Sequence, residues 1–279
     1  APGLASVYSL YLFDIVRGVV ERAAAAGCRA VILPDMPAAA GCEEDQDDYV
    51  RFLRERHADG LVVLLRPENR ARTARLMRAG LPAVAIDDGL LAADLPSIAA
   101  DNRQAARAAV EHLIRLGHRR IAHIAGMPVF GCAHEREAGY REAMAAAGLA
   151  GEAIVVGGDH LRRTGFRVTQ ALLASPRPPT AVFCACDDTA LGAMDAARSM
   201  GLTVGRDLAC VGFNDTRAAA EALPPLTTVH QPLSEFGRQA TDRVLDWLET
   251  GGPPSSRREV LTCHLVVRRS CGALPPDRT

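Results

Sequence analysis

The sequence predicts an α/β protein built from two doubly wound lobes, each with a mostly parallel sheet covered by helices. Short apolar strands alternate with helices along most of the chain, and many of these helices end at a glycine, as expected of repeated βα units. The strands are apolar on both faces, which suits a parallel sheet with helices on either side. Two more strands follow after the alternation has ended. A closed barrel of eight units would not need them, whereas two lobes that exchange terminal strands would.

The stretch from residue 179 to residue 216 is the clearest unit. It consists of an apolar strand at residues 180–186, a helix at residues 190–200 that is closed by Gly201, and a second apolar strand at residues 208–211. A polar cluster at residues 187–189 follows the first strand directly, and another at residues 214–216 follows the second strand after Gly212 and Phe213. Open α/β sheets bind ligands just beyond their strand ends, so these clusters are candidate contacts.

The remaining elements are expected from the spacing of apolar side chains. In the first part of the chain, helices at residues 12–26, 45–56, 70–79 and 102–116 alternate with strands at residues 29–33, 60–65 and 83–86. In the second part, strands at residues 119–125 and 153–156 alternate with helices at residues 135–147 and 164–174. The final strands, at residues 226–230 and 260–267, flank a helix at residues 235–249.

The composition is that of an ordinary globular protein and argues against several functional classes. Of 279 residues, 48% are hydrophobic and 23% are charged, and a net charge of −1 gives no overall attraction to nucleic acid or to an anionic membrane. No apolar run approaches the ~20 residues that span a bilayer, and the N-terminus shows no signal peptide. We therefore expect a cytoplasmic protein that does not interact with membranes.

Neither the cysteines nor any motif indicates catalysis or metal binding. The eight cysteines are scattered, and several lie in expected core strands, so we expect structural roles for most of them. The chain lacks the glycine-rich loops that cradle nucleotide phosphates and the Gly-x-Ser-x-Gly turn of hydrolases. His118 and His123 face opposite sides of an expected strand, which does not suit a zinc site. The protein is therefore expected not to be an enzyme and to need no metal and no cofactor.

Six segments resemble the effector-binding core of LacI/GalR-type transcriptional repressors, in that family's order and spacing. They are residues 101–126, 136–140, 179–194, 211–215, 226–232 and 265–270. The resemblance covers essentially the whole chain. It implies a periplasmic-binding-protein type I fold, in which two Rossmann-like lobes are joined by three chain crossovers, here near Ile114, His230 and Leu261.

The resemblance also implies a domain organisation and a set of partners. Residues 1–113 and 232–261 would form the N-terminal lobe, and residues 114–231 and 262–279 the C-terminal lobe. The family's helix-turn-helix domain is absent from this chain, so operator DNA would be bound only through that missing N-terminal domain. A homodimer is expected, with a small polar effector, a sugar or a related metabolite, in the cleft between the lobes. A periplasmic sugar-binding protein of a transport system has the same fold and is the alternative.

Three candidate ligand contacts carry the sharpest expectations. Arg136 matches a cleft arginine of the family, whose guanidinium can hold hydroxyls or a carboxylate through two parallel bonds. Asn214 matches a position usually held by Asp; its amide keeps an acceptor but lacks the charge, which disfavours a cationic effector. Cys186 stands where sugar-binding relatives often have Asn, so one polar contact to a sugar is missing.

For the other candidates, a purely structural role is as well supported as a ligand contact. Asp187 matches a ligand position, but Asp187 or Asp188 is also expected as the N-cap of the helix that follows. Side chains that match cleft positions but could instead fill the lobe interface, cap a turn or brace a crossover are Tyr11, Leu12, Phe130, His160, Asp88 and Gln231.

Overall fold

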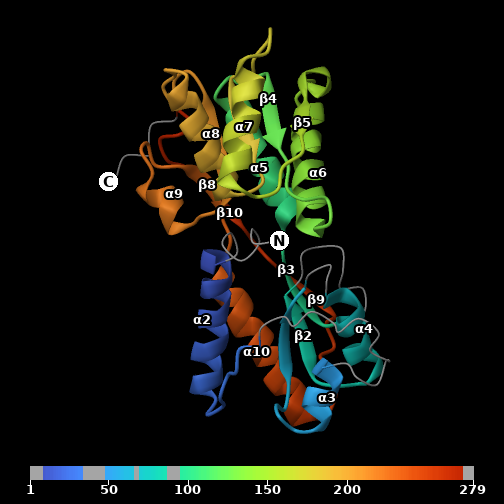
Figure 1. The fold of residues 1–279 in the computed structure, drawn as a ribbon. Coiled ribbons are helices and arrows are strands. Elements are labelled where there is room, and N and C mark those ends of the chain that lie inside the picture. The colour runs from blue at the N-terminus through green and yellow to red at the C-terminus, as the bar shows by residue number, and fades with distance from the viewer. Residues whose placement is uncertain (1–8, 34–47, 66–68, 87–94, 273–279) are drawn as a thin grey trace, which may run out of the picture. The chain divides into compact units, whose positions relative to one another are not determined.

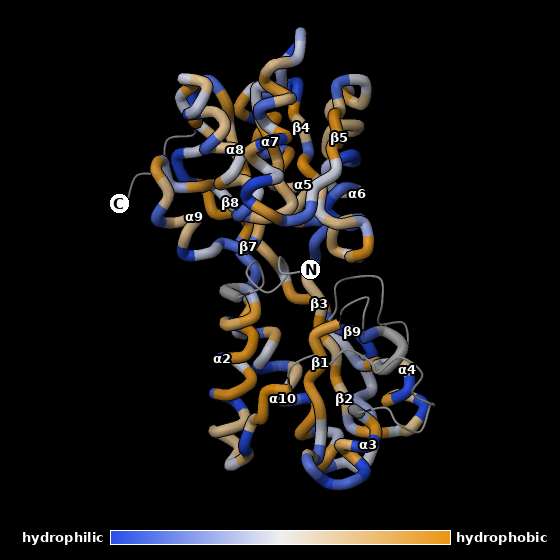
Figure 2. Tube along the Cα trace, in the orientation of Figure 1, coloured by the Kyte–Doolittle hydropathy of each residue, from blue (hydrophilic) through white to orange (hydrophobic). Residues whose placement is uncertain are grey.

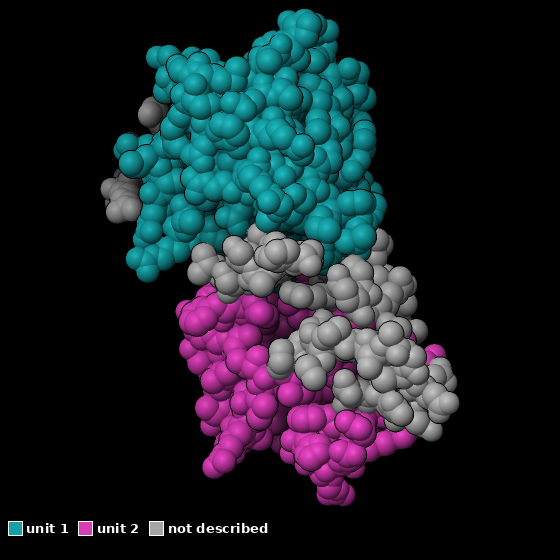
Figure 3. All heavy atoms as spheres, viewed as in Figure 1, with its two compact units in different colours: residues 1–11, 101–231, 262–279 teal, residues 12–100, 232–261 magenta. Residues whose placement is uncertain are grey.

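The computed structural model describes residues 9–33, 48–65, 69–86 and 95–272 (Figure 1). The chain divides into two compact units (Figure 3). Unit 1 comprises residues 1–11, 101–231 and 262–279, and unit 2 comprises residues 12–100 and 232–261. Each unit contains a mostly parallel sheet with helices, which confirms the predicted fold class.

Unit 2 has a four-stranded parallel sheet in the order β1-β2-β3-β9. Its strands are β1 (Leu61–Leu64), β2 (Ala83–Ile86), β3 (Ser97–Ala100) and β9 (Arg258–Leu261). Its helices are α2 (Ser9–Ala25), α3 (Asp48–Arg54), α4 (Arg70–Arg78) and α10 (Leu233–Thr250). The tube in Figure 2 is mostly hydrophobic along β1 and β2, as expected of strands with both faces covered.

The helices of unit 2 pack on the sheet and on each other. Leu53 of α3, Val63 of β1 and Leu76 of α4 belong to one buried cluster. The helix α10 contacts β1, β2 and β3 and also packs against α2. A Cβ at Gly18 of α2 would lie 1.9 Å from the Ser234 carbonyl oxygen, so these two helices approach to a distance that only glycine allows.

Unit 1 has a six-stranded sheet in the order β10-β8-β7-β6-β4-β5, parallel except for β10. Its strands are β4 (Ile121–Ile124), β5 (Ile154–Val156), β6 (Ala181–Cys184), β7 (Ala209–Asn214), β8 (Thr227–His230) and β10 (His264–Val266). Its helices are α5 (Asn102–Arg115), α6 (Gly131–Ala146), η3 (Ala150–Glu152), α7 (Arg162–Leu173), α8 (Asp187–Ser199) and α9 (Arg217–Glu221). The sequence-based lobe boundary at residue 113 lies inside α5, which contacts α6, β6, β8 and β10 of unit 1.

Alternate side chains of these strands enter two different hydrophobic layers. Ile124, Val182 and Cys184 lie in one buried cluster with residues of α8. On the other face, the His123 ring stacks between Tyr140 of α6 and Phe183 of β6. Both layers exclude water from the strands, which explains why these strands are apolar on both faces.

The strand order of unit 1 contains a topological switch point. From β4 the chain runs outward to β5 and then returns across β4 to β6, so successive connections leave β4 in opposite directions. In open α/β sheets, the crevice for ligands forms at the carboxyl ends of the strands at such a point. The segments that follow β4 and β6 are therefore where a ligand site is expected on physical grounds.

Several elements differ from the sequence-based expectations. Residues 29–33 form no strand; within the described ranges their backbone pairs with no other strand, and Val31 is 69% exposed. A strand needs a neighbour for its backbone groups, and the described ranges provide none for this segment. β3 was not expected, because its Ser-Ile-Ala-Ala sequence is only weakly apolar. The expected strand at residues 260–267 is split into β9 and β10, because its two halves pair with different sheets.

Candidate functional site

The carboxyl-terminal edge of the unit 1 sheet gathers most of the side chains predicted to bind a ligand. Gly126 follows β4, His160 follows β5, and Cys186 follows β6. Asn214 is the last residue of β7, and Gln231 follows β8. Because these strands are parallel, residues separated by up to about a hundred positions meet at one edge of the sheet.

Arg136 is the central side chain of this edge. It projects from α6, is only 5% exposed, and donates from Nε to Asn102 Oδ1 at 2.9 Å and from Nη1 to the Ala185 carbonyl oxygen at 2.5 Å. Its Cζ lies 3.7 Å from the centre of the Phe213 ring, which is a cation–π contact. A guanidinium carries five N–H groups, so Arg136 has donors left over after these bonds.

Phe130 and His160 lie together beside the end of β4. Their ring centroids are 6.0 Å apart in an edge-to-face arrangement. A Cβ at position 126 would lie 2.3 Å from His160 Nε2, so Gly126 is what allows the imidazole to pack at this strand end. Burial, together with the charge of Arg136, lowers the pKa of His160 to about 4. The imidazole is therefore neutral near pH 7.

Asn214 and Gln231 are joined by their side chains. Gln231 Nε2 donates to Asn214 Oδ1 at 2.7 Å, and Gln231 is only 3% exposed. Asn214 has a φ of 122°, which L-residues seldom adopt. The amide oxygen of Asn214 is thus engaged within the protein, and within the described residues no hydrogen bond engages its NH2 group at the end of β7.

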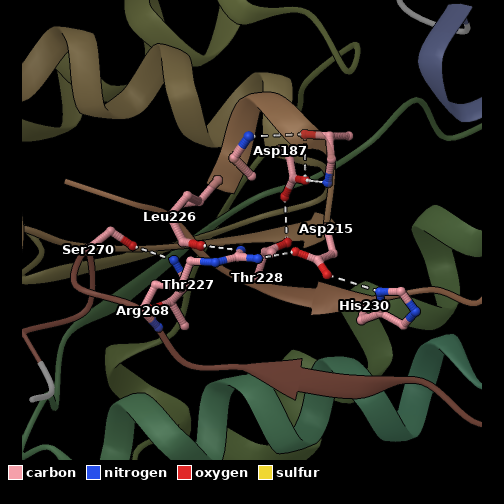
Figure 4. Close-up of polar contacts among 10 residues, drawn as sticks. Asp187, Asp215, Leu226, Thr227, Thr228, His230, Arg268 and Ser270 are labelled. Atoms are coloured by element: carbon pink, nitrogen blue, oxygen red, sulfur yellow. Dashed lines mark hydrogen bonds and ion pairs between the residues drawn. The ribbon is translucent and has the colours of Figure 1, made fainter. Parts of the chain in front are cut away.

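Asp187 joins three segments of unit 1. It is 1% exposed and accepts hydrogen bonds from the Thr216 backbone N–H at 2.7 Å, from Thr216 Oγ1 at 3.0 Å and from Thr228 Oγ1 at 2.5 Å (Figure 4). Burial raises its pKa to about 7, although these hydrogen bonds act in the opposite direction. Both carboxylate oxygens thus accept hydrogen bonds from the protein, so Asp187 has a structural role, and its contact with a ligand stays a prediction.

The expected N-cap at Asp187 or Asp188 is wrong. The helix α8 starts at Asp187, and its N-cap residue is Cys186, whose side chain makes no capping hydrogen bond to a backbone N–H of the first turn. The Cys186 thiol donates to the His160 carbonyl oxygen at 3.4 Å and contacts Thr189 Oγ1 at 3.3 Å. Burial raises the pKa of Cys186 to about 12, so it is a thiol, consistent with the structural role expected of the cysteines.

Three further candidates lie neither on the strands of the unit 1 sheet nor on the segments that follow those strands. Tyr11 and Leu12 are half-buried on α2, which lies mostly in unit 2. Asp88 lies outside the described residues. These three positions stay predictions.

Sequence reasoning missed several residues that shape the edge. Asn102 accepts from Arg136 and donates from Nδ2 to Glu135 Oε2 at 3.0 Å, so it positions the guanidinium. The sequence could have indicated Asn102, because it is a polar residue at the start of a helix that follows a strand. Phe213 gave no signal, because it lies in an apolar strand where a core role is the ordinary expectation.

A second polar network lies beside Asp187. Asp215 accepts from Arg268 Nη2 at 2.6 Å with one oxygen, and its other oxygen lies 3.0 Å from His230 Nδ1 (Figure 4). Arg268 also donates from Nη1 to the Leu226 carbonyl oxygen at 2.8 Å. These bonds tie the segment after β10 to the ends of β7 and β8.

Neither a metal-binding group of three or more side chains nor a membrane-spanning helix is found among the described residues. No group of three or more His, Cys, Asp or Glu side chains in the described ranges is arranged to hold a metal ion. None of the helices in those ranges is both long enough and apolar enough to cross a membrane.

Comparisons with known proteins agree with this architecture. Residues 110–271 match the family model of the periplasmic binding protein-like domain. The chain is 32% identical over 266 residues to the HTH-type transcriptional repressor CytR of Escherichia coli K12, covering 95% of this chain and 76% of that protein.

Two solved structures show how far the likeness extends in three dimensions. A regulatory protein of the LacI family from Chloroflexus aggregans superimposes with a TM-score of 0.81 at 32% identity, covering 93% of this chain and 92% of that one. The lac repressor dimer bound to operator and the anti-inducer ONPF superimposes with a TM-score of 0.81 at 29% identity, covering 96% and 79%.

Proposed function

This chain belongs to the LacI family of transcriptional regulators, and we propose that it is the effector-binding and dimerisation core of such a regulator, acting in the cytoplasm. In this proposal a small polar metabolite binds at the carboxyl-terminal edge of the unit 1 sheet. CytR, to which 95% of the chain is similar, is by its name an HTH-type transcriptional repressor. That likeness favours a regulator over a periplasmic sugar-binding protein of a transport system.

The observation that carries the effector site is the position of Arg136. Its guanidinium lies at the topological switch point, fixed by Asn102, Ala185 and Phe213, and it retains N–H donors beyond those bonds. A rigid, partly satisfied guanidinium is suited to hydroxyl, carboxylate or phosphate oxygens. The neighbouring Asn214 amide adds further donors.

The charges at this edge indicate which ligands fit. Arg136 is cationic, His160 is neutral near pH 7, and the Asp187 carboxylate is occupied by Thr216 and Thr228. The edge therefore offers more donors than free acceptors. It suits a neutral or anionic ligand rich in oxygen acceptors, such as a sugar, a sugar acid or a nucleoside, better than a cationic one.

The response to such a ligand would be a population shift between two states of the core. A ligand shifts this equilibrium only by its difference in affinity for the two states. In the full-length protein, operator affinity would differ between those states. Operator binding is tested with the full-length product of the gene, by comparing DNA affinity with and without the effector.

A thermal-shift screen tests the effector site directly. The library would contain pentoses, hexoses, sugar acids, nucleosides, nucleobases and amino-acid derivatives. A ligand at 100 times its Kd adds ~2.7 kcal/mol of stability, which is readily measured. We expect at least one hit whose effect is lost in Arg136→Lys. A hit that stabilises wild type and Arg136→Lys equally would remove Arg136 from the site.

The homodimer is proposed to use a groove on unit 1 near α9. The groove has a volume of about 530 Å³ and is lined by Arg162, Leu191, Arg198, Ala218, Glu221, Ala222 and Leu223. Leu223 is 80% exposed, which is unusual for a large apolar side chain beside a hollow. The patch carries apolar surface together with both charge signs, so a second copy related by a two-fold axis could pair with it.

A further inference from the structure

Two histidines face each other across the edge strands of the unit 1 sheet. His230 of β8 and His264 of β10 are directly opposite in the antiparallel pair, which places their side chains on the same face of the sheet. Their ring centroids are 4.9 Å apart, with an interplanar angle of 39°. An imidazole nitrogen binds a transition metal at about 2.0–2.1 Å, so rings this close can each offer a nitrogen to one ion.

His230 already has the second partner that metal-binding histidines commonly have. Its Nδ1 lies 3.0 Å from Asp215 Oδ2, and a carboxylate only accepts, so Nδ1 carries the hydrogen. Nε2 is then the nitrogen with a lone pair. The other Asp215 oxygen is held by Arg268 at 2.6 Å, which fixes the carboxylate behind the ring (Figure 4). This carboxylate–histidine arrangement orients the ring and raises its basicity toward a metal.

His264 is exposed, and His230 keeps 39% of its side chain accessible. Within the described residues, no hydrogen bond or ion pair engages either ring nitrogen of His264; its contact is the His230 ring. A metal ion from solvent can therefore reach the pair without breaking an existing bond.

We propose that His230 and His264 bind one divalent transition-metal ion of the imidazole-preferring kind, Cu²⁺, Ni²⁺ or Zn²⁺, with water in the remaining coordination positions. Asp215 acts as a positioning residue behind His230. The described residues supply no third protein ligand, so the affinity is modest and should follow the general order in which Cu²⁺ exceeds Ni²⁺ and Zn²⁺. The site is separate from Arg136, although His230 is in register with Asn214 on β7.

Isothermal titration with Ni²⁺ and Zn²⁺ tests this proposal without knowledge of the effector. The protein carries no polyhistidine tag, and all variants carry Cys28→Ser, because Cys28 is an exposed free thiol. We expect one ion per chain, with affinity at least tenfold weaker in His264→Gln and in His230→Gln. The control is His57→Gln, an exposed histidine 3.1 Å from Glu55 and without a histidine partner, which should bind as the parent does.

Two results would overturn the proposal. One is the absence of binding by the Cys28→Ser parent; the other is equal affinity in the parent and in His264→Gln. Because the His264 side chain makes no hydrogen bond within the described residues, its variant should have the circular dichroism spectrum and melting temperature of the metal-free parent. Electron paramagnetic resonance of the Cu²⁺ complex adds an independent readout, with two nitrogen ligands expected in the parent and one in His264→Gln.

Discussion

The guanidinium carbon of Arg136 lies 3.7 Å from the centre of the Phe213 ring. This contact joins α6 to the end of β7, and the same guanidinium bonds to the segment after β6. One side chain thus connects three segments at the switch point of the sheet. Arg136 therefore has a structural role as well as its proposed contact with the effector.

Replacing Arg136 with lysine should weaken both roles. Lysine cannot donate to Asn102 and Ala185 together while stacking on Phe213, so a buried acceptor loses its partner, at a cost of about 1–3 kcal/mol. Binding of any ligand found by the screen should fall at least tenfold. Arg141→Lys is the control on the same helix, because Arg141 makes an exposed pair with Glu137 that contributes little. Equal stability losses in the two variants would contradict this prediction.

Changing Asn214 to aspartate should alter ligand preference without unfolding the protein. The aspartate keeps an oxygen that can accept the hydrogen bond from Gln231 Nε2, so the melting temperature should change little. The new charge adds an acceptor and should favour ligands with hydroxyl or amine donors over anionic ones. The thermal-shift screen, repeated on this variant, measures the change. An unaltered pattern of hits would show that Asn214 does not contact the ligand.

Asp187→Asn should change how stability depends on pH. The folded-state pKa of about 7 lies above the ordinary 3.8, so between these values the unfolded state releases its proton first. Stability from this group is complete below about pH 4 and is lost as the pH rises through 7. From pH 5 to pH 8, wild type should lose on the order of 2 kcal/mol relative to Asp187→Asn.

Urea unfolding followed by far-UV circular dichroism gives that difference. Tryptophan fluorescence is unsuitable, because the single tryptophan, Trp247, lies on α10 in unit 2. The buried histidines His123 and His160 titrate in both proteins, so their contributions cancel in the comparison. Parallel pH profiles for the two proteins would refute a raised pKa at Asp187.

Gly192→Ala should destabilise unit 1 through the contact between α7 and α8. A Cβ at position 192 would lie 2.0 Å from the Arg162 carbonyl oxygen, and one at Gly165 would lie 2.1 Å from the Thr189 carbonyl oxygen. Separating the two helices should cost about 1–3 kcal/mol. The control is Gly151→Ala, where nothing lies within 4 Å and the change should stay within about 0.5 kcal/mol. Similar melting temperatures for both variants would exclude this tight approach.

Leu223→Asp should convert the proposed homodimer to a monomer. The side chain is 80% exposed in the single chain, so the substitution costs little folding stability, but it places a charge on an apolar contact of the proposed interface. Analytical ultracentrifugation should give half the mass of wild type. Leu248→Asp is the comparison, an exposed leucine on α10 outside the groove, and it should leave the mass unchanged. A dimeric Leu223→Asp variant would mean that the interface lies elsewhere.

Much of the fold could be predicted because it follows from local patterns. The alternation of apolar strands and helices identified most elements. Polar residues after strands pointed to the ends of β6 and β7, where Asp187 and Asn214 lie, whereas Gln231 was a candidate only through the family resemblance. The prediction of a strand at residues 29–33 was wrong, because an apolar run forms a strand only where another strand pairs with it. β3 was missed because its sequence is only weakly apolar. It forms a strand because its backbone pairs with β2 and β9.

The sequence by itself determined the class of protein: two parallel sheets, the order of most elements, and the LacI family. The tertiary structure alone decided which polar groups are already used. Arg136 bonds to a carbonyl 49 residues away, and Asp187 is bonded by a hydroxyl 41 residues away. Such bonds depend on which strand ends meet at the sheet edge, and no local pattern specifies them. The physical reason is that helix and strand formation respond to neighbours along the chain, whereas the saturation of a buried charge depends on neighbours in space.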